Sequence, residues 1–207
     1  MSTTRLLLLG AVRIFQPVHG YLIRRELVSW NVGAWGNVNP GSIYSGLRTL
    51  VRQGFLEELA APDSVDPTAY RLTPDGENEY FRLLGEALWE PTPGDPTRLL
   101  AGLCFMTSLP RTEVREAMRA RAARLQAIIS GSGFQMSRLE QARTAPAHTV
   151  ELFVAARRRL EGELRWAQEF GQRIERGHYR FAGEPGAADG PAPDGTWPGP
   201  LPEPESF

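Results

Sequence analysis

Six side chains with hydroxyl or guanidinium groups are concentrated between residues 39 and 53. They are Ser42, Tyr44, Ser45, Arg48, Thr49 and Arg52. Such groups donate hydrogen bonds to phosphate oxygens, and an arginine can also bind the edge of a guanine base. The segment holds two arginines and no acidic residue, so its local charge is +2. This pattern favours contact with a nucleic acid, and the alternative is a solvated polar face of a helix.

The residues around this cluster predict a helix that runs from Asn39 to Gly54. Pro40 suits the first helical turn, where its missing N–H group leaves no hydrogen bond unmade. Gly54 suits the left-handed position that ends a helix. Apolar residues recur at helical spacing along one face: Ile43, Leu47, Leu50 and Val51. The six polar side chains therefore lie on or beside the opposite face.

Short strands and further helices are predicted on both sides of this helix. Strands over 55–59 and 69–72 are joined by the Pro- and Asp-rich turn 61–67, and a helix opens at Thr73-Pro74. Upstream, helices are predicted over 3–15 and 18–30. Tyr21, Leu22, Leu27 and Val28 form the apolar face of the second one. Residues 31–39 are predicted to be a loop or a short strand. Helix, strand, turn, strand, helix is the layout of a winged helix-turn-helix.

The second half of the chain is predicted to be helical, after a break at 91–96. Apolar residues fill 98–109, and amphipathic stretches over 111–143 and 148–176 predict a helical hairpin, with a candidate break at Gly131-Ser132-Gly133. Residues 183–205 are rich in Pro, Gly and acids, so we expect them to be disordered or draped on the surface. The predicted fold class is mainly α with a small β wing.

Charge is distributed unevenly along the chain, although the net formal charge is only −1. Residues 1–90 hold 8 Arg and 10 acids, whereas residues 98–181 hold 15 Arg and 8 acids. A DNA-binding domain is expected to be basic, so the total for the first third counts against DNA binding. The arginines at 157–159 could bind nucleic acid or pair with Glu151, Glu161 and Glu163 on the outside of the hairpin.

Four motifs resemble the PadR family of bacterial transcriptional regulators. They are LLLLGAV in the first helix, HGYLIRREL in the second, NPGSIYSGLRTLVRQGFLE in the third and YRLTPDGE after the wing. The resemblance covers about residues 5–90 and, more loosely, the hairpin. It implies a winged helix-turn-helix DNA-binding domain over 1–90, a helical dimerisation domain over 97–181 and an acidic tail over 182–207. It also implies a homodimeric repressor that binds palindromic operator DNA and is released by a small ligand or another signal.

The resemblance places the recognition helix on Ser42 to Arg52, with Tyr44 near the DNA backbone. Arg24, Arg25 and the wing residue Arg71 are further candidate DNA contacts. Two departures from the family pattern stand out. Ser45-Gly46 replaces a Pro-Ala pair, which is expected to loosen the helix, and Asp63 and Asp66 replace a basic wing tip. Acids near phosphates are repelled, so we expect little DNA affinity from the wing.

Other residues are candidates for ligand binding and dimerisation. Trp30, Trp35 and Trp89 could line a pocket for a small aromatic effector, although a packing role is the commoner one for Trp. The hairpin's candidate dimer contacts are Leu125, Ile129, Phe153, Leu160 and Leu164.

Several classes of function have no support in the residues. His19, His148 and His178 lack metal-ligand spacing, and no catalytic constellation or phosphate loop is present, so neither a metal, a cofactor nor an enzyme is predicted. The lone Cys104 is expected to be a buried small hydrophobe. No membrane span or signal segment is expected, which predicts a cytoplasmic protein. The alternative function is a protein-interaction or ligand-sensing winged helix with weak or no DNA binding.

Overall fold

The computed structural model describes residues 2–36, 38–60, 68–142 and 146–187, and for 2, 40, 132–142 and 147 only the backbone. The first part of the chain holds α1 (Ser2–Phe15), β1 (Val18–His19), α2 (Gly20–Ser29), α3 (Val32–Trp35), α4 (Pro40–Arg52), β2 (Leu56–Ala60), β3 (Thr68–Leu72) and α5 (Pro74–Trp89). The second part holds α6 (Thr97–Phe105), a 3₁₀ turn (Met106–Ser108), α7 (Arg111–Ala142), a 3₁₀ turn (Ala147–Thr149) and α8 (Val150–Glu175). The predicted fold class, a mainly α winged helix-turn-helix with a helical hairpin, is confirmed.

The small sheet is antiparallel, with strand order β1-β3-β2. Val18 pairs with Tyr70 across β1 and β3, and Leu56 pairs with Leu72 across β2 and β3. The prediction that Val18 and His19 open the second helix is wrong. A strand of two residues takes its conformation from its partner strand, which lies far along the sequence, so local periodicity does not reveal it.

Two further expectations for the helix-turn-helix are wrong. Residues 32–35 form the short helix α3 rather than a loop or strand. In α2 the buried apolar side chains are Ile23 and Leu27, whereas Tyr21 is 49% exposed and Val28 is 55% exposed. The inward face of α2 is therefore turned relative to the predicted one, and Tyr21 lies on the surface.

One apolar core joins the winged helix to the base of the hairpin. Its largest fully buried side chains are Tyr80 on α5, Phe105 on α6 and Phe181, which follows α8. Met118 on α7 and Phe170 on α8 belong to the same cluster. Because the core is continuous, the residues 91–96 connect two packed regions, and the division into domains at this point stays a prediction.

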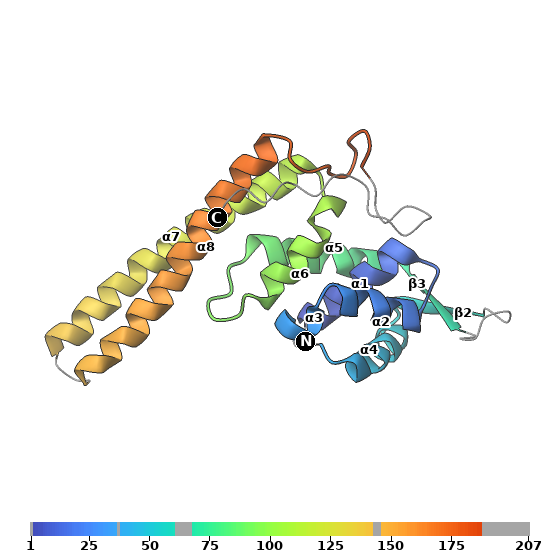
Figure 1. Ribbon diagram of the computed structural model, residues 1–207, viewed down its shortest axis with the longest axis horizontal. Helices are drawn as coiled ribbons and strands as arrows, with labels where there is room; N and C mark the ends of the chain where they lie inside the picture. Colours follow the sequence, from blue (N-terminus) through green and yellow to red (C-terminus); the bar gives the residue numbers. More distant parts are fainter. Residues whose placement is uncertain (1, 37, 61–67, 143–145, 188–207) are drawn as a thin grey trace.

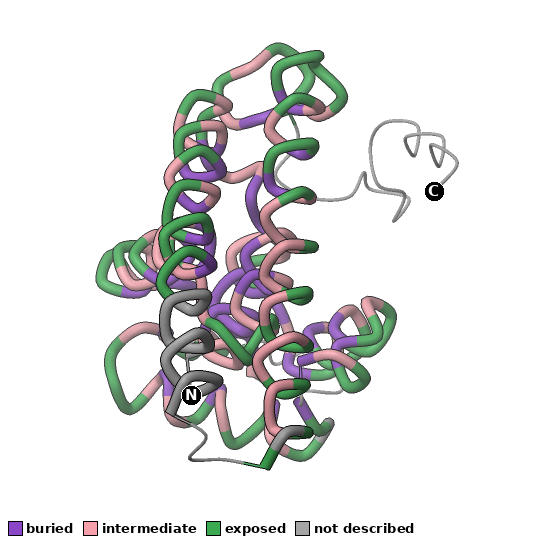
Figure 2. Tube along the Cα trace, turned by 90° about the vertical axis from the view of Figure 1, so that its left-hand side faces the viewer, coloured by how far each residue is buried: buried purple, intermediate pink, exposed green. Residues whose placement is uncertain are grey.

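The hairpin of α7 and α8 projects away from the winged helix, and its two helices lie side by side (Figure 1). The candidate break at Gly131-Ser132-Gly133 is wrong, because α7 is continuous from Arg111 to Ala142. Each glycine costs a helix about 1 kcal/mol relative to alanine, and packing against α8 is sufficient to offset that cost. Figure 2 shows buried residues on the inner sides of the helices and exposed ones along the outside.

The chain after α8 returns to the start of α7. The Arg111 guanidinium lies 4.9 Å from the centroid of the Phe181 ring, pairs with Glu184 at 2.6 Å, and donates to the carbonyl oxygens of Ile174 and Tyr179. The first residues of the acidic tail are thereby fixed on the surface, and 188–207 lie outside the described residues.

None of the helices in the described parts is long and apolar enough to cross a bilayer.

The side chain of Cys104 on α6 is exposed, so the prediction that it is buried is wrong.

Candidate nucleic-acid interface

Helix α4 presents its polar residues to solvent because its opposite face is anchored in the core. Ile43, Leu47 and Leu50 are 1%, 0% and 3% exposed, which fixes the rotation of the helix about its axis. Pro40 stands in its first turn, and Gly54 takes the left-handed conformation, with φ 76°, directly after its end. The start, end and buried face of this helix are therefore those predicted from the sequence.

The two serines and the threonine of α4 donate to backbone carbonyl oxygens of their own helix or of Asn39, the residue that precedes it. Ser42 Oγ donates to Asn39 O at 2.6 Å, Ser45 Oγ to Ser42 O at 2.9 Å, and Thr49 Oγ1 to Ser45 O at 2.8 Å. The hydroxyl oxygens of Ser42 and Ser45 keep their lone pairs for an outside donor, whereas Thr49 Oγ1 already accepts one hydrogen bond from Arg52. In this state the three side chains can accept hydrogen bonds from base amino groups, and a hydroxyl must rotate before it can donate to a phosphate.

The arginines of α4 differ in their bonding. Arg48 is exposed and has no hydrogen-bond or ion-pair partner among the described residues. Arg52 is also exposed, and its Nη2 donates to Thr49 Oγ1 at 3.1 Å. Neither guanidinium is neutralised by an acid within the described parts of the chain. Helix α4 thus offers two free positive charges on its solvent face.

An aromatic cluster stands beside α4 at the start of α2. Tyr44 is 37% exposed and its ring packs over Gly20. The rings of His19 and Tyr21 stack with centroids 6.0 Å apart, and His19 Nδ1 lies 3.2 Å from Thr68 O in the wing. Sequence reasoning missed Tyr21 as a surface residue, because its apolar ring suggested an inward position. These residues extend the exposed face of α4 towards the wing.

Gly46 lies at a close approach between two helices. A Cβ atom at this position would stand 2.5 Å from Leu8 Cδ1 on α1, so no larger residue fits without displacing Leu8. The helix itself is continuous through Gly46. The Ser45-Gly46 departure therefore has a packing reason that the sequence did not reveal.

The remaining cations near α4 are mostly paired. Arg71 on β3 stands opposite Glu57 on β2, and the two side chains form an ion pair at 2.7 Å. Arg25 pairs with Glu26 at 2.8 Å. Arg24 is exposed and has no such partner among the described residues. The described part of the wing therefore adds no net positive charge, and Asp63 and Asp66 lie outside the described residues.

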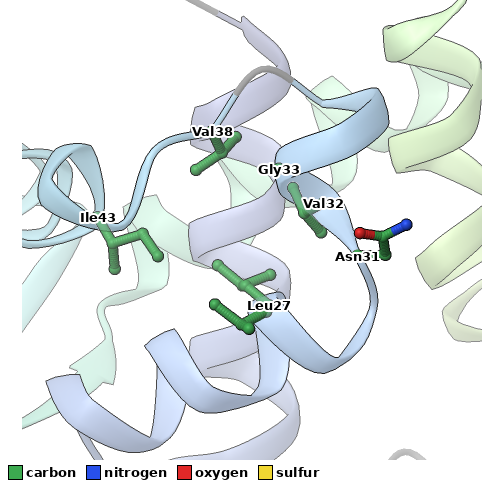
Figure 3. A pocket seen from close by; sticks show the side chains of 7 residues that line it. Leu27, Asn31, Val32, Gly33, Val38 and Ile43 are labelled. Carbon is green, nitrogen blue, oxygen red and sulfur yellow. The ribbon is translucent and has the colours of Figure 1, made fainter.

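A small apolar pocket lies behind the exposed face, where α2, α3 and the start of α4 meet. Its volume is about 220 Å³, and Leu27, Val38 and Ile43 lie around it (Figure 3). The side chain of Asn31 points away from Leu27 in this view. The apolar contacts around the pocket hold α4 against α2. No charged side chain is among the residues that line it.

The predicted effector-binding tryptophans pack into the chain. The Trp30 ring stands edge-on to Phe105 with centroids 5.8 Å apart, and Trp35 Nε1 donates to Trp30 O at 3.1 Å. Trp89 ends α5, and its carbonyl oxygen accepts from Arg124 at 2.8 Å. The contacts of Trp30 and Trp35 are those of packing residues, and a ligand role for the three stays a prediction.

A larger groove lies between α6 and α8. Its volume is about 740 Å³, and its lining includes Leu99, Leu103, Arg159, Glu163 and Trp166. This volume falls within the range of about 300–1,000 Å³ typical of small-molecule sites. The groove has an aromatic ring and apolar walls, and Arg159 has no ion-pair partner among the described residues.

The candidate dimer contacts fall into two groups. Leu125 and Ile129 on α7 are 0% and 5% exposed within the single chain. Phe153, Leu160 and Leu164 on α8 are partly exposed. The α8 residues are thus the ones that a second chain can reach directly. Of the nearby arginines, Arg157 and Arg158 pair with Glu161 at 2.8 and 3.0 Å.

No group of three or more His, Cys, Asp or Glu side chains able to hold a metal ion occurs in the described parts of the chain.

Residues 8–82 match the profile of the transcriptional regulator PadR-like family. The match runs from within α1 to within α5 and includes the whole of α4. A comparison with curated protein sequences finds no match.

Several solved structures are similar to the chain. Bacillus subtilis PadR in complex with operator DNA is 20% identical, with 84% of this chain and 98% of that chain covered and a TM-score of 0.37. The same protein in complex with p-coumaric acid is 20% identical, with 84% and 99% covered and a TM-score of 0.34. The PadR-like regulator BC1756 from Bacillus cereus is 16% identical, with 84% and 98% covered and a TM-score of 0.34. These TM-scores are low, so the superpositions support no conclusion about function.

Proposed function

We propose, from the match of residues 8–82 to the transcriptional regulator PadR-like family, that the protein binds palindromic operator DNA as a homodimeric repressor. The observation that carries the proposal is the solvent face of α4. It combines Arg48 and Arg52, neither of which pairs with an acid among the described residues, with three aliphatic hydroxyl groups and the exposed ring of Tyr44. A recognition helix in the major groove needs this combination of cations and hydrogen-bonding groups.

The first part of the chain binds DNA through α4 rather than through its total charge. Its 8 Arg and 10 acids give no basic field, and Arg71 is paired with Glu57 on the wing. Two copies of α4 in a dimer double the number of unpaired cations and enter successive turns of the duplex. Dimerisation is therefore needed for useful affinity.

The hairpin supplies the dimer contact in this proposal. Along α8 the apolar side chains of Phe153, Leu160 and Leu164 are partly exposed, and Leu152 is 71% exposed. Exposed apolar residues that recur along one helix favour association with a second amphipathic helix.

The groove between α6 and α8 is the site that we propose for a small effector that releases the DNA. Trp166 and the leucines of α6 suit an aromatic ring, and Arg159 suits an acidic substituent.

The proposal is tested by substituting Tyr44 and Arg48 with alanine in the full chain. Binding is measured by fluorescence anisotropy with duplexes selected from a random pool by the wild-type protein. A bidentate contact from arginine to guanine contributes about 1–3 kcal/mol, and a dimer makes two, so Arg48→Ala should weaken binding at least about 30-fold. The dimer should persist in sedimentation experiments.

Arg158→Ala is the matched control, because it removes the same charge from an exposed position on α8. It should leave DNA affinity nearly unchanged. If Arg48→Ala and Arg158→Ala have equal effects, the α4 surface is not the DNA-binding site.

The second candidate function is a winged helix that serves as a protein-interaction or ligand-sensing module. The Arg71–Glu57 pair and the acidic excess of residues 1–90 favour it. It predicts that no duplex is enriched by selection and that no salt-dependent binding to a specific duplex is measured. A repressor loses affinity steeply as salt rises, because phosphate contacts release counterions.

A further inference from the structure

Arg121 on α7 is the charged residue that the described structure buries most deeply. It is 2% exposed, and in the described parts of the chain it is the one buried side chain that carries a charge. A buried charge is costly unless its hydrogen bonds are made. Arg121 must therefore find hydrogen-bond acceptors and a counter-charge among the groups that surround it.

The guanidinium of Arg121 joins three helices. Its Nη1 donates to the carbonyl oxygens of Ala87 and Leu88 at 3.1 Å each, and of Glu90 at 3.2 Å. These carbonyls lie at the end of α5, where a helix has acceptors without partners of its own. On its other side Arg121 binds Glu163 of α8, with Nε and Nη2 at 2.8 and 2.7 Å from the same oxygen.

A second arginine, one turn further along α7, reinforces this joint. Arg124 donates to Trp89 O at 2.8 Å and pairs with Glu90 at 3.2 Å. The last turn of α5 is thus capped by side chains of α7 rather than by water alone. Since α5 is the final helix of the winged helix-turn-helix, the joint links that unit to the hairpin.

We propose that the joint made by Arg121 and Glu163 with the end of α5 sets the angle between hairpin and winged helix, and so positions the two copies of α4 on DNA. Apolar contacts also hold these parts together, but they are non-directional. Hydrogen bonds are directional, and three of those made by Arg121 converge on one helix end. Arg121 and Glu163 are positioning residues in this account, and the inference rests on the function proposed above.

Because the hairpin is long, a small change in its angle to the winged helix moves its far end by a large distance. Between Arg121 and Ala142, 21 residues of α7 extend for ~31 Å at 1.5 Å per residue. A change of about 10° at the joint would therefore shift the far end by roughly 5 Å. If hairpins dimerise, the same change alters the distance between recognition helices, which must match the ~34 Å turn of DNA.

The test compares full-length wild type with Arg121→Gln and Glu163→Gln on three duplexes. A palindromic site selected by the wild type is used alone, as a single half-site, and with two base pairs inserted between its halves. Glu163→Gln keeps the size of the side chain and all carbonyl contacts of Arg121, so it remains informative if Arg121→Gln unfolds. Thermal unfolding and sedimentation confirm that each variant is folded and dimeric.

The expected result is a split between full-site and half-site binding. Affinity for the full site should fall about tenfold, because two linked contacts give their avidity only when their geometry matches. Affinity for the half-site should stay within twofold of wild type, and the penalty for the inserted base pairs should become smaller. A purely structural role would lower all three affinities together.

Arg119→Gln is the matched control. Arg119 also lies on α7 and pairs with Glu175 of α8 at 2.9 Å, and it makes no bond to α5 among the described residues. It should bind all three duplexes like wild type. An unchanged ratio of full-site to half-site affinity in both test variants, a parallel loss on all duplexes, or the same split in Arg119→Gln would overturn the inference alone. Failure of the wild type to bind any duplex would instead overturn the proposed function.

Discussion

At the scale of single residues, the arginine side chains occupy three different environments. Arg48 is exposed and has no partner in the described parts of the chain, Arg71 is neutralised by Glu57 across the wing, and Arg121 is buried at the end of α5. The first two placements follow from positions that the sequence indicates, a helix face and a strand. The third cannot be inferred locally, because the acceptors of Arg121 lie more than 30 residues away in the sequence.

Glu79 on α5 makes stability depend on pH. Hydrogen bonds from Arg82, and then from Arg5 on α1, hold the pKa of Glu79 below its ordinary value of 4.5. A lowered folded-state pKa stabilises the fold above the unfolded value, and this contribution is lost as pH falls through the folded pKa. Glu79→Gln should therefore lower stability by about 1 kcal/mol at pH 7, a figure kept small because Arg82 is half exposed.

The measurement is chemical denaturation of both proteins at pH 7 and at several values below 4.5. The difference between wild type and Glu79→Gln should shrink at the acidic end. Glu169→Gln, which removes an exposed carboxylate on α8, should match wild type throughout. A difference for Glu79→Gln that persists at low pH would show that size or packing, rather than charge, explains its effect.

At the scale of elements, the wing is the part that departs most from a DNA-binding design. Glu57 stands directly opposite Arg71 in the β2–β3 register. Glu57→Gln should free the Arg71 guanidinium and remove one acid, so that DNA affinity rises about threefold to tenfold. The slope of binding against salt should become steeper by up to ~1 for each protomer that gains a phosphate contact. Anisotropy titrations at several salt concentrations measure both quantities.

Glu169→Gln provides the matched change of charge away from the wing. If it strengthens binding as much as Glu57→Gln does, the gain reflects net charge. If neither changes the affinity, the wing does not approach the duplex.

The elements also show which features could be predicted from sequence. Helix α4 was predictable because its start at Pro40, its end near Gly54 and the spacing of its apolar residues are local features of the sequence. The start of α5 was predictable for the same reason, since Thr73 Oγ1 accepts a hydrogen bond from Gly76 N at 3.0 Å. The strand at Val18–His19 was not, because its partner β3 lies about 50 residues away. Gly131 and Gly133 suggested a break in α7, but the packing of a long hairpin outweighs their low helix propensity.

At the scale of the whole molecule, the proposed DNA-binding face of α4 and the proposed dimer contacts on α8 lie on different parts of the fold, because the hairpin projects away from the winged helix (Figure 1). The candidate site could be predicted as a set of positions on one helix, since exposure follows from helical periodicity. The bonding state of those residues could not, because it depends on neighbours such as Glu57 and Gly20. The proposed DNA binding requires two copies of α4 acting together, because one copy carries only two arginines that no acid neutralises in the described parts of the chain.

The central claim is tested most directly by selecting DNA from a random pool with the full-length protein and then titrating the enriched duplex. We predict palindromic sites whose half-sites lie one helical turn, about 10 base pairs, apart. One dimer should bind each duplex, with affinity that falls steeply as salt rises. No enrichment of any sequence, or binding that does not change with salt, would contradict it.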